Sequence, residues 1–260
     1  MGQERFKEVR PVSHIFIRGH KMVVHDDDVI ISARLRRGVV YERSSINLVE
    51  SRIQPGQTFV NVGANIGYFT LILARLVGVT GHGYAFEPEP DNFKLLAENV
   101  KLNGYENITI INSAVSNATG TLTLYLNDKQ NRGDHRIWDN TGARVKTTVD
   151  VVTLDEYLSC LDEHIDFIKM DVQGAEAGVI EGAERILDED GPMILMEFWP
   201  WGLRQAGHDP IDMINGLVRH GYSIFDMPGD GTLHRISVSD LQSFPSRHVD
   251  AKNIWLEKRI

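Results

Sequence analysis

A glycine-containing turn lies where an apolar strand pattern gives way to a helical one, in the stretch FVNVGANIGYFTLILARL. Gly63 and Gly67 form a G-x-x-x-G spacing with Asn65 between them. Glycine lets a ligand lie against the backbone, and the free N–H groups at a helix start attract an anionic group. The spacing is neither the G-x-G-x-x-G of dinucleotide sites nor the Gly-Lys-Ser/Thr of a P-loop. A plain packing turn is the alternative interpretation.

An acidic residue, Glu87, ends the next expected strand in YAFEPEP. A carboxylate at this position of a nucleotide-binding fold accepts ribose hydroxyls. Alternatively, Glu87 only favours the start of the helix that follows. Together with the glycine turn it indicates an adenosyl ligand. Ser113 and Ala114, in INSAVS, would then flank the adenine, with Asn112 or Ser113 bonding its edge.

Asp171 follows the apolar run of IDFIKMDVQGAE, where a strand is expected to end. A carboxylate there could hold a cationic amino group or orient a substrate hydroxyl. Its alternative role is to cap the helix near Gly174.

The polar loop NRGDHRIWDN offers a general base, because the ordinary pKa of histidine lies near neutrality. His135 is the candidate base, Asp134 could orient its ring, and Arg136 could bind a hydroxyl-rich or anionic substrate through its planar fork. Asp171 and Glu197 are alternative bases, and Glu197 could instead be a structural acid. The loop could also be a solvated segment of mixed charge.

Trp138 and Trp199 could form apolar platforms for a sugar face, although such residues also pack in cores. The other histidines have no tight metal spacing. Asp171, Glu197 and His135 could hold Mg²⁺, but nothing in the sequence requires a metal.

Strand and helix patterns alternate after residue 57, which favours an α/β fold with a parallel sheet and helices on both faces. The expected strands are 58–62, 82–88, 108–115, 120–127, 145–152, 165–172, 192–198, 222–227 and 253–259. The expected helices are 66–76, 90–104, 153–161 (capped by Thr153), 175–187 and 210–221. The closing strand pair indicates one antiparallel member.

The first 54 residues form a separate pattern, which we interpret as a β-rich N-terminal extension with a short helix, serving as a cap or a dimer surface. Residues 14–40 alternate as short strands with turns at Arg18-Gly19 and 26–28. A helix over 44–53 is expected, capped by Ser44 or Ser45. Residues 55–260 form the main domain, in which 199–210 has the composition of a loop at the cleft mouth.

Composition narrows the functional class. The chain has 260 residues and a formal net charge of −9, which argues against a nucleic-acid partner. A single cysteine, Cys160, excludes an internal disulfide and fits a cytoplasmic setting. No apolar run reaches the length of a membrane span or a signal-peptide core, so neither is expected. The sequence does not decide between a monomer and a homo-oligomer.

Several motifs together resemble FkbM-type S-adenosylmethionine-dependent methyltransferases: FVNVGANIGYFT, YAFEPEPDNFKLLAENVKLNG, INSAVSNATGTLTLY, VVTLDEYL and IDFIKMDVQGAE, in that order. The resemblance covers roughly residues 38–230. It implies a seven-stranded class I methyltransferase sheet, S-adenosylmethionine as methyl donor with S-adenosylhomocysteine as product, and O-methylation of a hydroxyl in a sugar, polyketide or related metabolite.

The resemblance also implies roles for individual residues. It implies that Gly63, Asn65 and Gly67 form the turn on the methionine side, and that Glu87 accepts the ribose hydroxyls. It implies that Ser113 and Ala114 contact the edge of the adenine. Asp171 would be the acid that faces methionine and substrate, and Glu42 an acid that closes over the cofactor. G-D-H-R loops occur in family members, which favours His135 as the base.

Two positions depart from the family pattern. Asn61 stands where Asp is frequent, so binding of the methionine ammonium would depend more on Asp171 or Glu42. Gln173 stands where Glu is frequent, which weakens a carboxylate pair at 171 and 173. An N-methyltransferase and a non-catalytic S-adenosylmethionine-binding module are the alternative functions.

Overall fold

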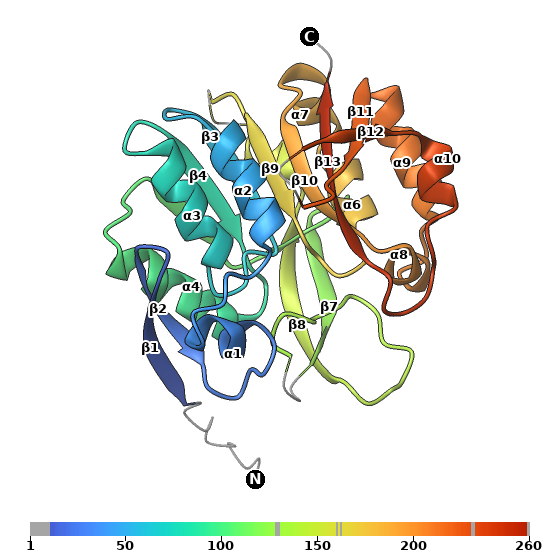
Figure 1. The fold of residues 1–260 in the computed structure, drawn as a ribbon. Helices are drawn as coiled ribbons and strands as arrows, with labels where there is room; N and C mark the ends of the chain where they lie inside the picture. Colours follow the sequence, from blue (N-terminus) through green and yellow to red (C-terminus); the bar gives the residue numbers. More distant parts are fainter. Residues whose placement is uncertain (1–10, 128–130, 160, 162, 230–231, 259–260) are drawn as a thin grey trace.

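In a computed structural model of the chain, residues 11–127, 131–159, 161, 163–229 and 232–258 are described. Cys160 lies outside them. The central feature is an eight-stranded sheet in the order β12-β11-β13-β10-β9-β3-β4-β5 (Figure 1). Its strands are β3 (Thr58–Val62), β4 (His82–Phe86), β5 (Ile108–Ile111), β9 (Phe167–Met170), β10 (Met193–Phe198), β11 (Tyr222–Asp226), β12 (His234–Ile236) and β13 (Lys252–Lys258).

The predicted mixed sheet is confirmed. β5, β4, β3, β9 and β10 are parallel neighbours, and β13 lies antiparallel between β10 and β11. These strands and β11 make the expected seven, and the short β12 adds an antiparallel edge. The chain runs from β3 outward to β5 and then crosses back to β9 beside β3. The carboxyl ends of β3 and β9 therefore meet at a topological switch point, where open α/β sheets bind ligands.

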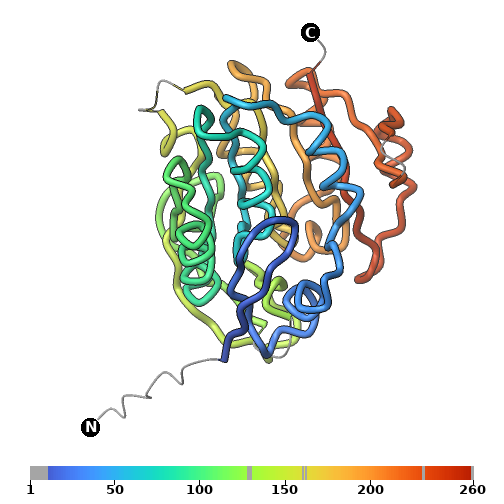
Figure 2. The backbone as a smooth tube through the Cα atoms, turned by 60° about the vertical axis from the view of Figure 1, so that its left-hand side comes forward, coloured from blue at the N-terminus to red at the C-terminus, as the bar shows by residue number. Residues whose placement is uncertain are grey.

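Two apolar layers cover the sheet because side chains alternate along each strand. Phe59 faces α2 (Arg43–Arg52), α3 (Tyr68–Val77) and α4 (Pro90–Leu102), which Figure 2 shows side by side. Val60 and Val62 face the opposite layer. That layer contains α5 (Leu154–Tyr157), α6 (Glu176–Glu181), α7 (Glu184–Glu189), α9 (Pro210–Arg219) and α10 (Val238–Gln242). No helix in the described part of the chain is long and apolar enough to cross a membrane.

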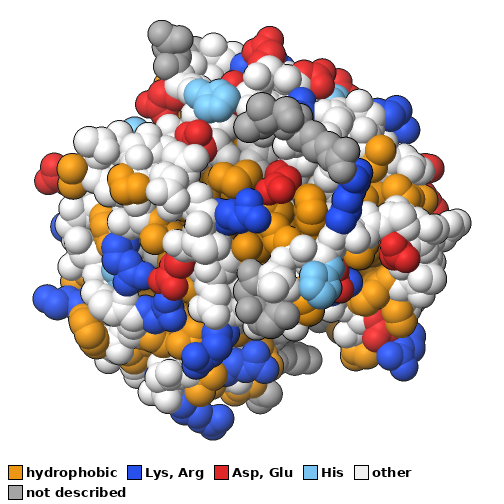
Figure 3. All heavy atoms as spheres, turned by 45° about the horizontal axis from the view of Figure 1, so that its top comes forward, with side chains coloured by type: hydrophobic (Ala, Val, Ile, Leu, Met, Phe, Trp, Pro, Cys, Tyr) orange, Lys and Arg blue, Asp and Glu red, His pale blue; other side chains and the backbone are white. Residues whose placement is uncertain are grey.

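The N-terminal segment begins with a hairpin of β1 (Val12–Ile17) and β2 (His20–His25), turning at Arg18-Gly19 as predicted. It packs on α4, where the Asn99 side chain hydrogen-bonds both the N–H and the C=O of Val23 at 2.6 and 3.0 Å. In Figure 1 the hairpin lies beside α4, with α1 between it and β8. Figure 3 brings the opposite side forward, where acidic and basic side chains are interspersed.

Two predictions for this segment are wrong. The strand expected to extend through residues 31–36 is instead a short helix, α1 (Ile31–Arg36). The Asp28 carboxylate starts it by accepting the N–H groups of Ile30 and Ser32. Helix α2 begins at Arg43 without a side-chain cap, so neither Ser44 nor Ser45 is its N-cap.

A separate three-stranded sheet corrects a third prediction. Residues 108–115 are not one strand, because β6 (Ala114–Val115) pairs with β8 (Val145–Val152), which in turn pairs with β7 (Gly120–Leu126). The chain turns at Asn112, whose amide donates to the carbonyls of Glu87 and Pro88 at 2.8 and 3.2 Å. This sheet carries the loop that contains His135 to the carboxyl edge of the main sheet.

Two helices also differ from the prediction. The helix expected over 175–187 is divided into α6 and α7 at Gly182, where an added Cβ would lie 2.1 Å from the carbonyl oxygen of Ser116. The stretch 199–210, expected to be a loop, contains α8 (Pro200–Gln205). Its start is favoured by Pro200, whose fixed φ suits the first helical turn. Thr153 caps α5 as predicted, accepting the N–H of Glu156.

Candidate active site

The glycine turn follows β3 and has a left-handed backbone. Gly63, Asn65 and Gly67 have φ of +75°, +52° and +91°. A Cβ at Gly63 would lie 2.1 Å from the carbonyl oxygen of Asp171, so only glycine fits between β3 and β9 there. At Gly67 a Cβ would meet Leu96 of α4 at 2.9 Å. Gly67 lines neither of the two cavities described below, which gives it a packing role in place of the predicted ligand contact.

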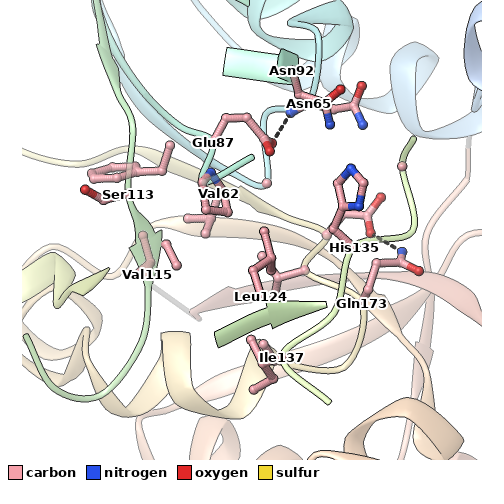
Figure 4. Close-up of a pocket in the computed structure, with 18 of the residues that line it drawn as sticks. Val62, Asn65, Glu87, Asn92, Ser113, Val115, Leu124, His135, Ile137 and Gln173 are labelled. Atoms are coloured by element: carbon pink, nitrogen blue, oxygen red, sulfur yellow. Dashed lines mark hydrogen bonds between the residues drawn. The ribbon is translucent and has the colours of Figure 1, made fainter. Parts of the chain in front are cut away.

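A first cavity opens beside Glu87, with about 600 Å³ of empty space including open solvent. Figure 4 shows Glu87, Asn65 and Ser113 around it, with Val115, Leu124 and Ile137 forming an apolar wall. Ala114 also lines it. The cavity thus combines a carboxylate, a polar edge and an apolar slot, as an adenosine requires. Asn112 does not line it, because its amide is bound to main-chain carbonyls.

The Glu87 carboxylate is buried and accepts two backbone N–H groups. Asn65 donates to Oε2 at 2.7 Å, and Glu89 donates to Oε1 at 2.9 Å. Burial raises the pKa of Glu87 from 4.5 to about 7, against the opposing effect of these donors. An ionised Glu87 therefore gains from any further hydroxyl that donates to it.

A second cavity lies on the α3 side, with about 460 Å³ of empty space including open solvent. Asn61 lines it from β3 and is fully buried. Its Nδ2 donates to Thr70 Oγ1 at 2.9 Å, and its Oδ1 has no hydrogen-bond partner within the described residues. Because a buried polar atom without a partner is costly, this oxygen is ready to accept from a bound group.

Three charged residues share this cavity with Asn61: Lys169, Glu42 and Asp171. Lys169 lies opposite Asn61 in the parallel ladder. Glu42 precedes α2 with φ of +48°, and its Oε2 accepts a 2.6 Å hydrogen bond from Asn253. Burial raises the pKa of Glu42, and the positive charge of Lys169 opposes this. The cavity therefore holds acceptors for an ammonium and a cation for a carboxylate.

The two cavities meet at a common wall formed by Gly63, Asn65, Gly133 and Asp171. Glu87, the predicted ribose acceptor, lines the first cavity together with Ser113 and Ala114, the predicted adenine edge. Glu42 lines the second cavity. Together they fit an elongated ligand that has a nucleoside at one end and an amino acid at the other.

Gln173 joins two carboxylates at the strand ends. Its Nε2 donates to Asp171 Oδ1 at 2.8 Å and lies 3.2 Å from Glu197 Oε2. Lys169 Nζ is 3.5 Å from Asp171 Oδ2 on the other side. Burial, and then the charges of nearby carboxylates led by Asp171, raise the pKa of Glu197 well above its usual range. Glu197 lines neither cavity, whereas Asp171 lines both.

His135 reaches the first cavity from the loop between β7 and β8. Its Nδ1 accepts the backbone N–H of Asn127 at 3.1 Å. The neutral ring therefore carries its proton on Nε2. In this geometry Nε2 is a hydrogen-bond donor, so it cannot take a proton from a substrate as a general base would. Asp134 does not orient it, contrary to the prediction, because the Asp134 carboxylate pairs with Arg136 and Arg144.

The predicted substrate contacts of Arg136 and two tryptophans are replaced by a packed cluster. The Arg136 guanidinium pairs with Asp134 and lies 4.5 and 4.8 Å from the ring centres of Trp138 and Trp199. Trp138 is 8% exposed and Trp199 is 4% exposed. Arg136, Trp138 and Trp199 do not line either cavity. We therefore interpret their cluster as packing that stabilises the loop. The Arg136 Nε–H is paired with Asp134.

No three His, Cys, Asp or Glu side chains gather as metal ligands among the residues that the structure describes. Asp171, Glu197 and His135 are accordingly not arranged as an Mg²⁺ site. The sequence interpretation also missed Lys169, although a lysine inside the apolar run IDFIKMDV was the available signal. It gave no role to Arg132 and Gly133, which belong to the NRGDHRIWDN loop and line the first cavity.

The sheet order and the joined cavities define the fold as that of a class I methyltransferase. Residues 61–224 match the methyltransferase FkbM domain family, and the chain belongs to this family. It is an S-adenosylmethionine-dependent methyltransferase, as the resemblance implied. The match begins after the N-terminal segment that supplies Glu42.

Known proteins agree with this assignment. Methyltransferase sdnD of Sordaria araneosa is 28% identical over 176 residues, covering 56% of this chain and 68% of that protein. Methyltransferase 1 of Beauveria bassiana is 29% identical over 150 residues, covering 50% of this chain and 60% of that protein. The crystal structure of methyltransferase FkbM from Methylobacillus flagellatus KT has a TM-score of 0.50 at 18% identity. It covers 79% of this chain and 44% of that larger chain, a likeness of fold alone.

Proposed function

We propose that the protein transfers a methyl group from S-adenosylmethionine to a hydroxyl oxygen of a small molecule, with a sugar or a polyketide-type metabolite as the acceptor class. The observation that carries this proposal is the common wall of Gly63, Asn65, Gly133 and Asp171 between a nucleoside-type cavity and an amino-acid-type cavity.

The residues present fit the methyl donor. Glu87 would accept the ribose hydroxyls, and Ser113 with the apolar wall would hold the adenine. In the second cavity, the unpartnered Oδ1 of Asn61 and the carboxylate of Glu42 would bind the methionine ammonium. Lys169 would bind the methionine carboxylate. Neutral Asn61 thus suffices where the family often has Asp, because two neighbouring side chains supply the charges.

When bound, S-adenosylmethionine supplies a methyl group already activated by a positive sulfur, so the chain's own task is mainly to align the acceptor. Asp171 lines both cavities and is the residue that we assign to hold the acceptor hydroxyl and take its proton. Gln173 fixes Asp171 through the 2.8 Å hydrogen bond to Oδ1. His135 would donate from Nε2 to an acceptor oxygen, in keeping with the tautomer implied by the hydrogen bond from Asn127.

Charge supports a neutral acceptor. The chain carries a formal net charge of −9, and Asp171 and Glu197 meet at the strand ends with Lys169 as their neighbouring cation. A polyanion such as a nucleic acid would be repelled by this arrangement. The Asp171 carboxylate, which lines both cavities, would attract a protonated amine, and this observation favours N-methylation as the second candidate function.

Binding and transfer can be tested separately. Calorimetry of the wild-type chain with S-adenosylhomocysteine should give a micromolar dissociation constant, roughly −8 kcal/mol. Absence of binding would overturn the methyl-donor site. Incubation with methyl-labelled S-adenosylmethionine and a panel of sugars, polyketide alcohols and amines, followed by mass spectrometry, then identifies the acceptor.

The matched variant is Asp171→Asn, which keeps the shape of the side chain. It should retain S-adenosylhomocysteine binding within about tenfold and lose transfer to an alcohol by a factor of about 10² or more, the usual scale for a general base. Label found only on amine nitrogens would replace the O-methylation proposal with N-methylation.

A further inference from the structure

The loop between β7 and β8 crosses the methyl-donor site at Arg132 and Gly133. Gly133 belongs to the wall shared by the two cavities. A Cβ at this position would lie 2.7 Å from Ile31 Cδ1 and 3.6 Å from Asn65 Nδ2. The backbone therefore lies between the N-terminal segment and the glycine turn, and a side chain here would displace the end of the Ile31 side chain.

The main chain of this crossing is held by two amides. The carbonyl oxygen of Arg132 accepts from Asn65 Nδ2 at 3.1 Å and from Asn92 Nδ2 at 2.9 Å. Figure 4 shows Asn65 and Asn92 side by side, next to Glu87. His25, at the end of β2, lies with Nε2 3.0 Å from Asn92 Oδ1, which turns the amide donor toward Arg132. The hairpin thus reaches the crossing indirectly through α4.

The side chain of Arg132 is held directly by Asp27, which follows β2 of the hairpin. Its Nε donates to Asp27 Oδ1 at 3.1 Å, and its terminal nitrogen donates to Asp27 Oδ2. The Arg132 side chain is 5% exposed and that of Asp27 is 40% exposed. A guanidinium this deeply buried needs its counter-ion, since an unpaired buried charge is strongly unfavourable. Asp27 lies outside the matched family domain, which begins at residue 61.

We propose that the Arg132–Asp27 ion pair is a clasp that closes the methyl-donor site. The N-terminal segment thereby becomes part of that site, holding Arg132 and Gly133 across the junction of the nucleoside and amino-acid cavities. We expect that movement of this crossing speeds release of the donor product, because Gly133 lines both cavities. The inference rests on the proposed function, since it takes the joined cavities as the methyl-donor site.

The test measures S-adenosylhomocysteine release from the full chain. Labelled S-adenosylhomocysteine is bound and then displaced by an excess of unlabelled compound. Asp27→Asn should raise the dissociation rate about tenfold, between the effects expected for an exposed and a buried ion pair. Asp27→Glu keeps the charge and should restore most of the slow release. The wild-type rate should increase with ionic strength more steeply than that of Asp27→Asn.

Asp26→Asn is the matched control, because it removes the same charge one residue away. Asp26 pairs with Arg36 at 3.3 Å and does not line either cavity. This variant should release S-adenosylhomocysteine at the wild-type rate. If Asp27→Asn released S-adenosylhomocysteine at the wild-type rate, or if both variants released it equally faster, the clasp would be overturned and the methyl-donor site would remain. A wild-type chain that binds no S-adenosylhomocysteine would overturn both.

Discussion

The backbone N–H of Asn65 donates a 2.7 Å hydrogen bond to the carboxylate of Glu87, which fastens the turn after β3 to the end of β4. The left-handed backbone at Asn65, with φ of +52°, directs this N–H toward the neighbouring strand. Glu87 therefore both shapes the glycine turn and presents acceptor oxygens to the nucleoside cavity. The two motifs that the sequence indicates separately form one structural unit.

Replacing Glu87 tests the nucleoside end of this unit. Glu87→Ala should weaken S-adenosylhomocysteine binding by about 1–3 kcal/mol, because ribose hydroxyls and the Asn65 N–H both lose their acceptor. The same variant should weaken the binding of 5′-methylthioadenosine, which lacks the amino-acid moiety, by a similar amount. Calorimetry of both ligands measures the effect. Unchanged affinity for both would place the ribose elsewhere.

Asn61 tests the amino-acid end. Asn61→Leu removes the unpartnered Oδ1 while roughly keeping the volume of the side chain, so S-adenosylhomocysteine should bind more weakly by about 1.5–3 kcal/mol, the range for hydrogen bonds to charged groups. Binding of 5′-methylthioadenosine should change little. The contrast with Glu87→Ala makes the measurement specific, and equal losses for the two ligands would argue against an ammonium contact at Asn61.

The sheet and most of the nucleoside cavity could be predicted because their signals are local. The glycine spacing, Glu87 and the strand patterns each lie within a few residues, and strand ends in a parallel sheet meet at one edge. The hydrogen bond of Gln173 to Glu197 joins the turn after β9 to β10, and sequence spacing does not reveal that these two side chains meet.

The NRGDHRIWDN loop was harder to interpret for the same reason. Its residue types suit both catalysis and packing, and the choice depends on tertiary neighbours. Arg136 pairs with Asp134 and packs against tryptophans, whereas His135, between them, faces the cavity. The short helix α1 was missed because its start depends on the Asp28 cap and not on hydrophobic periodicity.

The raised pKa of Glu87 predicts the pH dependence of binding. In the free protein, burial raises the pKa of the Glu87 carboxyl from 4.5 to about 7. The protonated carboxyl therefore contributes its full stabilisation of the fold below pH 4.5, and this contribution is lost as the pH rises through 7. Ribose hydroxyls favour the ionised form, so S-adenosylhomocysteine affinity should increase with pH up to about 7 and then level off.

Calorimetry between pH 5 and 8, in buffers of different ionisation enthalpy, measures this affinity and the released proton. The slope should approach about tenfold per pH unit at most, the limit for one proton. Glu87→Gln has no titratable group at this position and should show a flatter profile. A wild-type profile as flat as that of the variant would contradict the role of Glu87.

The close approach of Gly63 to Asp171 predicts a severe effect from a single methyl group. Gly63→Ala would place a Cβ 2.1 Å from the Asp171 carbonyl oxygen, in addition to the strain of φ at +75°.

Gly104 is the matched control, because its φ of +70° is nearly the same and nothing lies within 4 Å of an added Cβ. Gly104→Ala should cost about 1–2 kcal/mol of unfolding free energy, the left-handed strain alone. Gly63→Ala should cost at least about 2 kcal/mol more and weaken S-adenosylhomocysteine binding, because β3 and β9 must separate. Denaturant unfolding of both variants measures the difference, and equal losses would show that the two strands yield easily at the junction.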